Sequence, residues 1–178
     1  NYRVPNQNQC KECHLKNNEI MPIGPKSRNL NFSIEYKDKK ANQISYWLEN
    51  EMVENHIPLD LIVDWSDVSA PIEARARAYL DINCGHCHMP SGSADTTGLY
   101  LQLTETDNMK LGIYKKPVAA GRASGDLKYS IVPGKPDESI MLNRMKSLDP
   151  GEMMPESGRT TTHVEGVSIV NDWIISLK

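Results

Sequence analysis

Cys10-Lys11-Glu12-Cys13-His14 and Cys84-Gly85-His86-Cys87-His88 are two copies of one pattern, C-x-x-C-H, and together they use all four cysteines of this 178-residue chain. Two thiols three residues apart lie on one face of a helical turn, where each can form a thioether with a haem vinyl group. The histidine that follows can bind the haem iron through its imidazole. Each motif therefore predicts one covalently attached haem c. The predicted thioether residues are Cys10, Cys13, Cys84 and Cys87, and the predicted iron ligands are His14 and His88.

Three other interpretations of the same cysteines remain open. The tetrad at 84–87 also occurs in disulfide isomerases, but there it follows a buried strand, whereas a helix-like run precedes it here. Two C-x-x-C pairs can bind a structural zinc ion, although about 70 residues exceed the usual spacing and both histidines stay unexplained. A disulfide within either motif would be strained.

The composition excludes some classes of protein. The net charge is −3, charged residues make up 24% and no basic stripe is present, so no binding to nucleic acid is expected. No apolar stretch approaches the roughly 18 residues of a transmembrane segment. Leu, Ile, Val and Phe make up only about a fifth of the chain. We therefore expect the two haems to supply part of the interior.

Hydrophobic periodicity predicts helices over residues 6–16, 42–54, 71–88, 138–147 and 163–177, and a short strand over 99–103. Both halves of the chain share one order: a C-x-x-C-H helix, a loop, a Met-Pro pair and an amphipathic helix with a tryptophan. This order indicates a worn internal repeat with one haem in each half.

The sequence resembles the haem-bearing C-terminal region of a family of bacterial dihaem c-type cytochromes, within the cytochrome c superfamily. The similarity spans nearly the whole chain, and the matching segments are YRVPNQNQC (2–10), PIGPK (22–26), ARAYLD (76–81), PVAAGR (117–122), VPGKPD (132–137), MMPE (153–156) and WI (173–174). Members usually carry a further N-terminal domain. The resemblance thus implies a larger assembly or a missing N-terminal domain, with Asn1 at a cleavage point.

The predicted fold is mainly α: two small cytochrome c-like helical domains, each wrapped around one covalently bound haem, with long loops and little strand. Residues 1–66 form the first domain, which is shorter and degenerate, and residues 67–178 form the second.

The second haem needs a distal ligand. In cytochromes c with a Met-Pro loop before the last helix, the Met sulfur binds the iron, so the resemblance selects Met154. Met145, Met153 and His163 remain alternatives. Possible propionate partners among the basic residues are Arg122, Arg144 and Lys116.

The first haem has a less certain distal ligand. By its position in the repeat, Met21 corresponds to Met154. Seven extended residues reach about 23 Å, which is enough to pass from His14 around a haem edge. Met52, His56 and an open or externally supplied position are the alternatives.

These assignments predict a dihaem c-type cytochrome that carries electrons between redox protein partners. Haem c is attached outside the cytoplasm, so the expected location is the periplasm or the cell surface of a bacterium. If the first haem is accessible to ligands, the alternative is a dihaem peroxidase-like enzyme.

Overall fold

The computed structural model of the chain describes residues 4–54 and 62–178. Within them lie six α-helices: α1 (Gln7–His14), α2 (Ser27–Leu30), α3 (Gln43–Glu49), α4 (Ile72–Asn83), α5 (Ile140–Lys146) and α6 (Val164–Ser176). The strands are β1 (Leu15–Lys16), β2 (Glu19–Ile20), β3 (Ser33–Glu35) and β4 (Lys40–Asn42), and 3-10 turns lie at Asp95–Thr97, Gly121–Ser124 and Pro136–Glu138. Helices occupy all five segments predicted for them, although each is shorter than expected. None of the described helices is both long and apolar enough to cross a lipid bilayer.

The predicted fold of two haem-wrapped domains is wrong. The chain divides into a large unit, Asn1–Ile23 with Trp65–Lys178, and a small unit, Gly24–Asp64. The first C-x-x-C-H motif lies on α1, which has no buried residue and belongs to the large unit. The small unit, which was expected to wrap that motif, contains none of the four cysteines. The predicted boundary at residue 66 stays a prediction, because this grouping does not test whether either segment folds alone.

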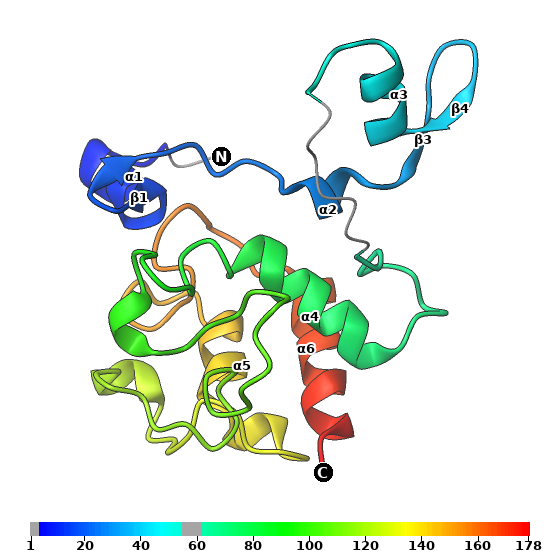
Figure 1. Ribbon diagram of the computed structural model, residues 1–178. Coiled ribbons are helices and arrows are strands. Elements are labelled where there is room, and N and C mark those ends of the chain that lie inside the picture. Colours follow the sequence, from blue (N-terminus) through cyan, green and yellow to red (C-terminus); the bar gives the residue numbers. More distant parts are fainter. Residues whose placement is uncertain (1–3, 55–61) are drawn as a thin grey trace. The chain divides into compact units, whose positions relative to one another are not determined.

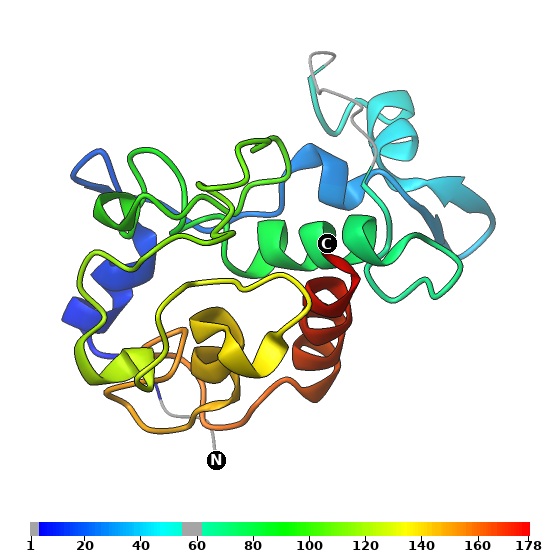
Figure 2. The ribbon, with the colours of Figure 1, turned by 90° about the horizontal axis from the view of Figure 1, so that it is seen from below.

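The core of the large unit is built where α4 and α6 pack side by side (Figures 1 and 2). α5 packs against α6 and closes the cluster. Its buried members are Ala76, Tyr79, Leu80, Leu101, Ile131, Met141, Leu142, Ile169, Val170, Trp173 and Ile174. Burying one such large apolar side chain contributes roughly 1.5–3 kcal/mol. The core between α4, α5 and α6 is therefore filled by protein side chains.

A glycine allows α4 and α6 to approach closely. Gly166 lies in the first turn of α6, and a Cβ at this position would overlap the ring and hydroxyl of Tyr79. Tyr79 is only 7% exposed, and its hydroxyl lies 3.0 Å from Nδ1 of His163, so its ring has little freedom to move aside. The close crossing thus requires glycine at position 166.

The strand predicted over 99–103 does not form. The amide of Leu101 donates to the carbonyl of His88 at 2.9 Å, and the amide of Leu103 donates to Oδ1 of Asp81 at 2.9 Å. These groups lie on the helix and on the motif rather than on a second strand. The alternating leucines therefore mark a segment that is bound to α4, with Leu101 in the core.

The small unit has its own packing. β3 and β4 pair antiparallel with Ile34 opposite Ala41, and Asn42 then caps α3 by accepting from the amide of Ser45 at 3.1 Å. Ile44 is buried, and the rings of Tyr36 and Tyr46 stack with centroids 3.8 Å apart. A hairpin and one short helix thus share a small aromatic cluster.

Replacing Gly166 with alanine should destabilise the large unit, although alanine is the better helix former by about 1 kcal/mol. The new methyl group must displace the packed Tyr79 ring, and we expect the free energy of unfolding to fall by about 1–3 kcal/mol in denaturant titrations. Ser168→Ala, at an exposed position of the same helix, is the control. The interpretation fails if Gly166→Ala costs as much in a Tyr79→Ala background.

Candidate functional site

The second C-x-x-C-H motif follows directly from the end of α4. The amides of Cys84 and Gly85 both donate to the carbonyl of Leu80 at 2.9 Å, which ends the helix. The carbonyl of Cys84 then accepts from the amides of Cys87 at 3.1 Å and His88 at 2.9 Å. A Cβ at Gly85 would lie 2.7 Å from the carbonyl oxygen of Asp81, so this tight turn requires glycine. The turn fixes Cys84, Cys87 and His88 to a buried helix.

A largely apolar cavity lies beside this motif, and all its lining residues belong to the large unit. Its space measures about 1030 Å³ when the part open to solvent is included. The apolar walls come from Leu80, Leu99, Leu101, Pro117, Val118, Ala119, Ala120, Ile140 and Met141. The wall also carries Cys84, Cys87, His88, Met145 and Met154.

The buried residue His88 has the properties of a metal ligand. It is only 6% exposed, so the ring is shielded from water. Burial lowers the pKa of the imidazole, an effect that the nearby Cys87 partly opposes. A lowered pKa keeps the ring neutral to lower pH, and a histidine must be neutral to bind a metal. The apolar wall, the two cysteines and the neutral histidine are therefore the kinds of group that would hold a haem.

The structure distinguishes the candidate distal ligands by their place relative to the cavity. Met154 and Met145 lie on its wall, whereas the side chain of Met153 is buried elsewhere, with 7% exposed. His163 instead contacts Tyr79, with ring centroids 5.5 Å apart. The loop that carries Met154 is bound to α5, since the amide of Met154 donates to the carbonyl of Arg144 at 3.0 Å.

The basic residues predicted as propionate partners also differ in whether they line the cavity. Arg144 lies on the cavity wall, where its Nε donates to the carbonyl of Glu152 at 2.9 Å. Lys115 lines the wall as well, in place of the predicted Lys116. Arg122 forms an ion pair with Asp149 at 2.6 Å. Arg144, which also forms an ion pair with Glu156 at 3.2 Å, and Lys115 are thus the cations on the cavity wall.

Two buried charged residues of α4 hold one wall of the cavity. An amino group of Arg77 donates to the carbonyls of Gln102, Leu103 and Glu105 at 2.9, 3.0 and 2.7 Å. Asp81, which is 1% exposed, accepts from the amide of Leu103. This network fixes the segment that carries the wall residues Leu99 and Leu101.

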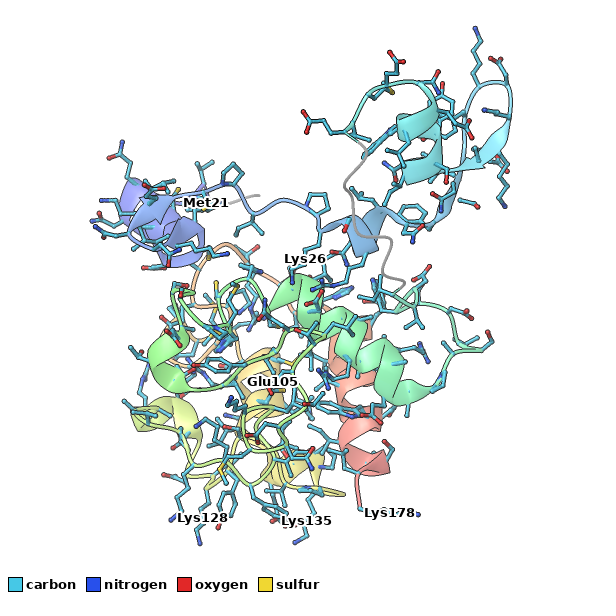
Figure 3. The ribbon with its side chains drawn as sticks, viewed as in Figure 1. Met21, Lys26, Glu105, Lys128, Lys135 and Lys178 are labelled. Atoms are coloured by element: carbon cyan, nitrogen blue, oxygen red, sulfur yellow. The ribbon has the colours of Figure 1, made fainter. Side chains whose placement is uncertain are left out.

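The first motif lies on α1 and is more exposed. Asn17 and Asn18 both have positive φ, 50° and 65°, and form the turn between β1 and β2. This hairpin returns the chain to α1, where the carbonyl of Met21 lies 2.9 Å from Nδ1 of His14. A carbonyl at Nδ1 leaves Nε2 as the nitrogen available to a metal. Met21 itself is 46% exposed, at the surface of the hairpin (Figure 3).

The other two residues considered for the first haem are Met52 and His56. Met52 is 64% exposed and belongs to the small unit. His56 lies outside the described residues.

The two motifs meet in the large unit. Cys13 of α1 also lines the cavity, and Sγ of Cys87 lies 3.9 Å from the carbonyl oxygen of Glu12. A hydrogen bond from the Cys13 thiol lowers the pKa of Cys87 to about 4 and raises that of Cys13. Burial raises the pKa of Cys84 to about 12. The Cys13–Cys87 pair therefore loses its first proton more readily than Cys84 does.

Sequence reasoning did not single out His86, Lys115 or the wall residues 117–120. His86 occupies a variable position of its motif, and its ligand atom lies within 4.8 Å of the sulfurs of Cys13 and Cys87. No local pattern reveals such a contact, because it joins segments far apart in the chain.

Comparisons with protein-family models, with curated proteins and with solved structures find no match. The resemblance to dihaem cytochromes therefore stays a prediction.

Replacing Arg77 with methionine should loosen the cavity wall. The substitution keeps much of the apolar length but leaves three carbonyls without their donor, and each unsatisfied buried group costs about 1–3 kcal/mol. We expect a lower midpoint in thermal unfolding. Lys110→Met, at an exposed residue, is the control and should leave the midpoint unchanged. Equal midpoints for Arg77→Met and wild type would show that the network contributes no stability.

Proposed function

We propose that this protein is a dihaem c-type cytochrome that carries electrons between redox partners. The observation that carries the proposal is one apolar cavity with both cysteines and the histidine of a C-x-x-C-H motif on its wall, together with a methionine from a Met-Pro pair. A haem held there supplies an iron that alternates between its ferrous and ferric states.

The second motif would hold its haem through Cys84 and Cys87, with His88 and Met154 as iron ligands. His88 is kept neutral by burial, and its position is fixed by the turn after α4. A Met and His ligand pair raises the reduction potential, and the apolar walls exclude water from the site. Arg144 and Lys115 supply positive charge for the propionates.

The first motif would hold the other haem through Cys10 and Cys13, with His14 as iron ligand. The carbonyl of Met21 orients the His14 ring. With Cys10 exposed and His14 half-buried, this haem lies partly in solvent, where it is suited to exchange electrons with a partner. Cys13 lines the same cavity as Cys87, and this proximity favours electron exchange between the two haems.

The location follows from the chemistry of attachment. Haem c is attached outside the cytoplasm, so we place the mature protein in the periplasm or at the surface of a bacterial cell. The chain carries a net charge of −3 before the haem propionates are counted, which suits a redox partner with a basic face.

Covalent haem content tests the function directly. The chain should be produced in a bacterial periplasm with the haem-attachment machinery, and the intact mass should exceed the chain mass by two haems. Cys10→Ala/Cys13→Ala and Cys84→Ala/Cys87→Ala should each carry one haem. A wild-type chain without covalent haem contradicts the proposal. A high-spin spectrum that changes with cyanide would instead support the peroxidase-like alternative.

The distal ligand can be tested with a matched pair of variants. Met154→Leu should abolish the far-red Met-to-iron band of the oxidised protein and lower the potential of one haem, because the sulfur ligand is lost. Met145→Leu, a similar change on the same cavity wall, should keep both. If the band is lost in Met145→Leu and kept in Met154→Leu, Met145 is the iron ligand instead.

A further inference from the structure

Three side chains from the two motifs form a cluster that haem attachment does not account for. The ligand atoms of Cys13, His86 and Cys87 all lie within 4.8 Å of one another. Cys13 comes from α1, while His86 and Cys87 come from the turn after α4. His86 is not part of the C-x-x-C-H pattern itself, so the cluster joins the motifs through a residue of its own.

One contact and one unsatisfied buried nitrogen support the arrangement. Sγ of Cys87 lies 3.9 Å from the carbonyl oxygen of Glu12, so the end of α1 contacts the second motif through its backbone as well. Nδ1 of His86 is buried and has no hydrogen-bond partner among the described residues. A buried nitrogen without a partner costs free energy, and a metal ion bound by the imidazole is one way to offset that cost.

We propose that the chain without haem binds one zinc-type metal ion through Cys13, His86 and Cys87. Two thiolates and an imidazole are a ligand set that zinc prefers. Bond lengths of about 2.0–2.3 Å in a tetrahedron place the ligand atoms about 3.3–3.8 Å apart. Since no two of the three atoms lie more than 4.8 Å apart, a contraction of at most about 1–1.5 Å gives this geometry. The fourth position is left for water or another ligand from solution.

The metal site and haem attachment exclude each other at Cys13 and Cys87. A thioether sulfur carries no negative charge, so a chain with both haems has lost both thiolates. The metal therefore binds before attachment or in competition with it. Binding also joins α1 to the end of α4, so the bound ion should stabilise the large unit.

The test uses the full chain produced without haem under reducing conditions. Co²⁺ is the spectroscopic probe, and displacement by Zn²⁺ gives the zinc affinity. We expect one ion per chain, with a sulfur-to-cobalt band whose intensity corresponds to two thiolates. Cys13→Ser and His86→Asn should each weaken zinc binding at least about 10-fold. Cys10→Ser and Cys84→Ser, which alter the other cysteine of each motif, should bind as the wild type does.

Several outcomes would overturn the proposal. Two ions per chain, or an equal loss in Cys10→Ser and Cys13→Ser, would show that each C-x-x-C pair binds metal locally. No binding by the wild type would exclude the site. Far-UV circular dichroism of each variant separates a lost ligand from a lost fold, and the cobalt band should fall to one thiolate in Cys13→Ser. Since no haem is present in this experiment, its result is independent of whether the chain becomes a cytochrome.

Discussion

The close crossing of α4 and α6 at Gly166 is the contact on which the site depends. It allows Tyr79 to lie directly on α6 and brings Leu80 into the same core as Trp173. α4 then ends one residue before Cys84, so the motif continues from a buried helix and not from a free loop. A site on a rigid element keeps its geometry better than one on a loop. Helix packing therefore determines where His88 and both sulfurs lie.

The buried charges of α4 serve the cavity that lies next to that helix. Taking the Arg77 guanidinium out of water is costly, but three carbonyls accept from it and offset the cost. Those carbonyls belong to the segment after Leu101, which thereby stays against the core. An apolar wall fixed in this way keeps water from the cavity, and in the proposed cytochrome this burial would help to determine the haem potential. The polar network thus acts on function through the apolar surface that it holds in place.

Local patterns predicted much of the large unit, and long-range contacts explain what they missed. The periodicity of α4 and α6, and the Met-Pro pair at Met154, are readable over a few residues each. The contact between α1 and Cys87 cannot be predicted from a local pattern, because it joins residues about 75 positions apart in the sequence. The sequence also predicted that residues 24–64 form one domain with the first motif. In the structure, Ile44 and the Tyr36–Tyr46 stack give these residues a core of their own. An apparent repeat in the sequence therefore did not become a repeat of domains.

The meeting of the two motifs gives their cysteines unequal chemistry. A thiolate is the reactive form of cysteine toward both metals and carbon electrophiles. The hydrogen bond from Cys13 favours the thiolate at Cys87, whereas burial keeps the proton on Cys84. Cys87 also belongs to the cluster with Cys13 and His86, so the proposed metal ion and the proposed haem would compete for one sulfur.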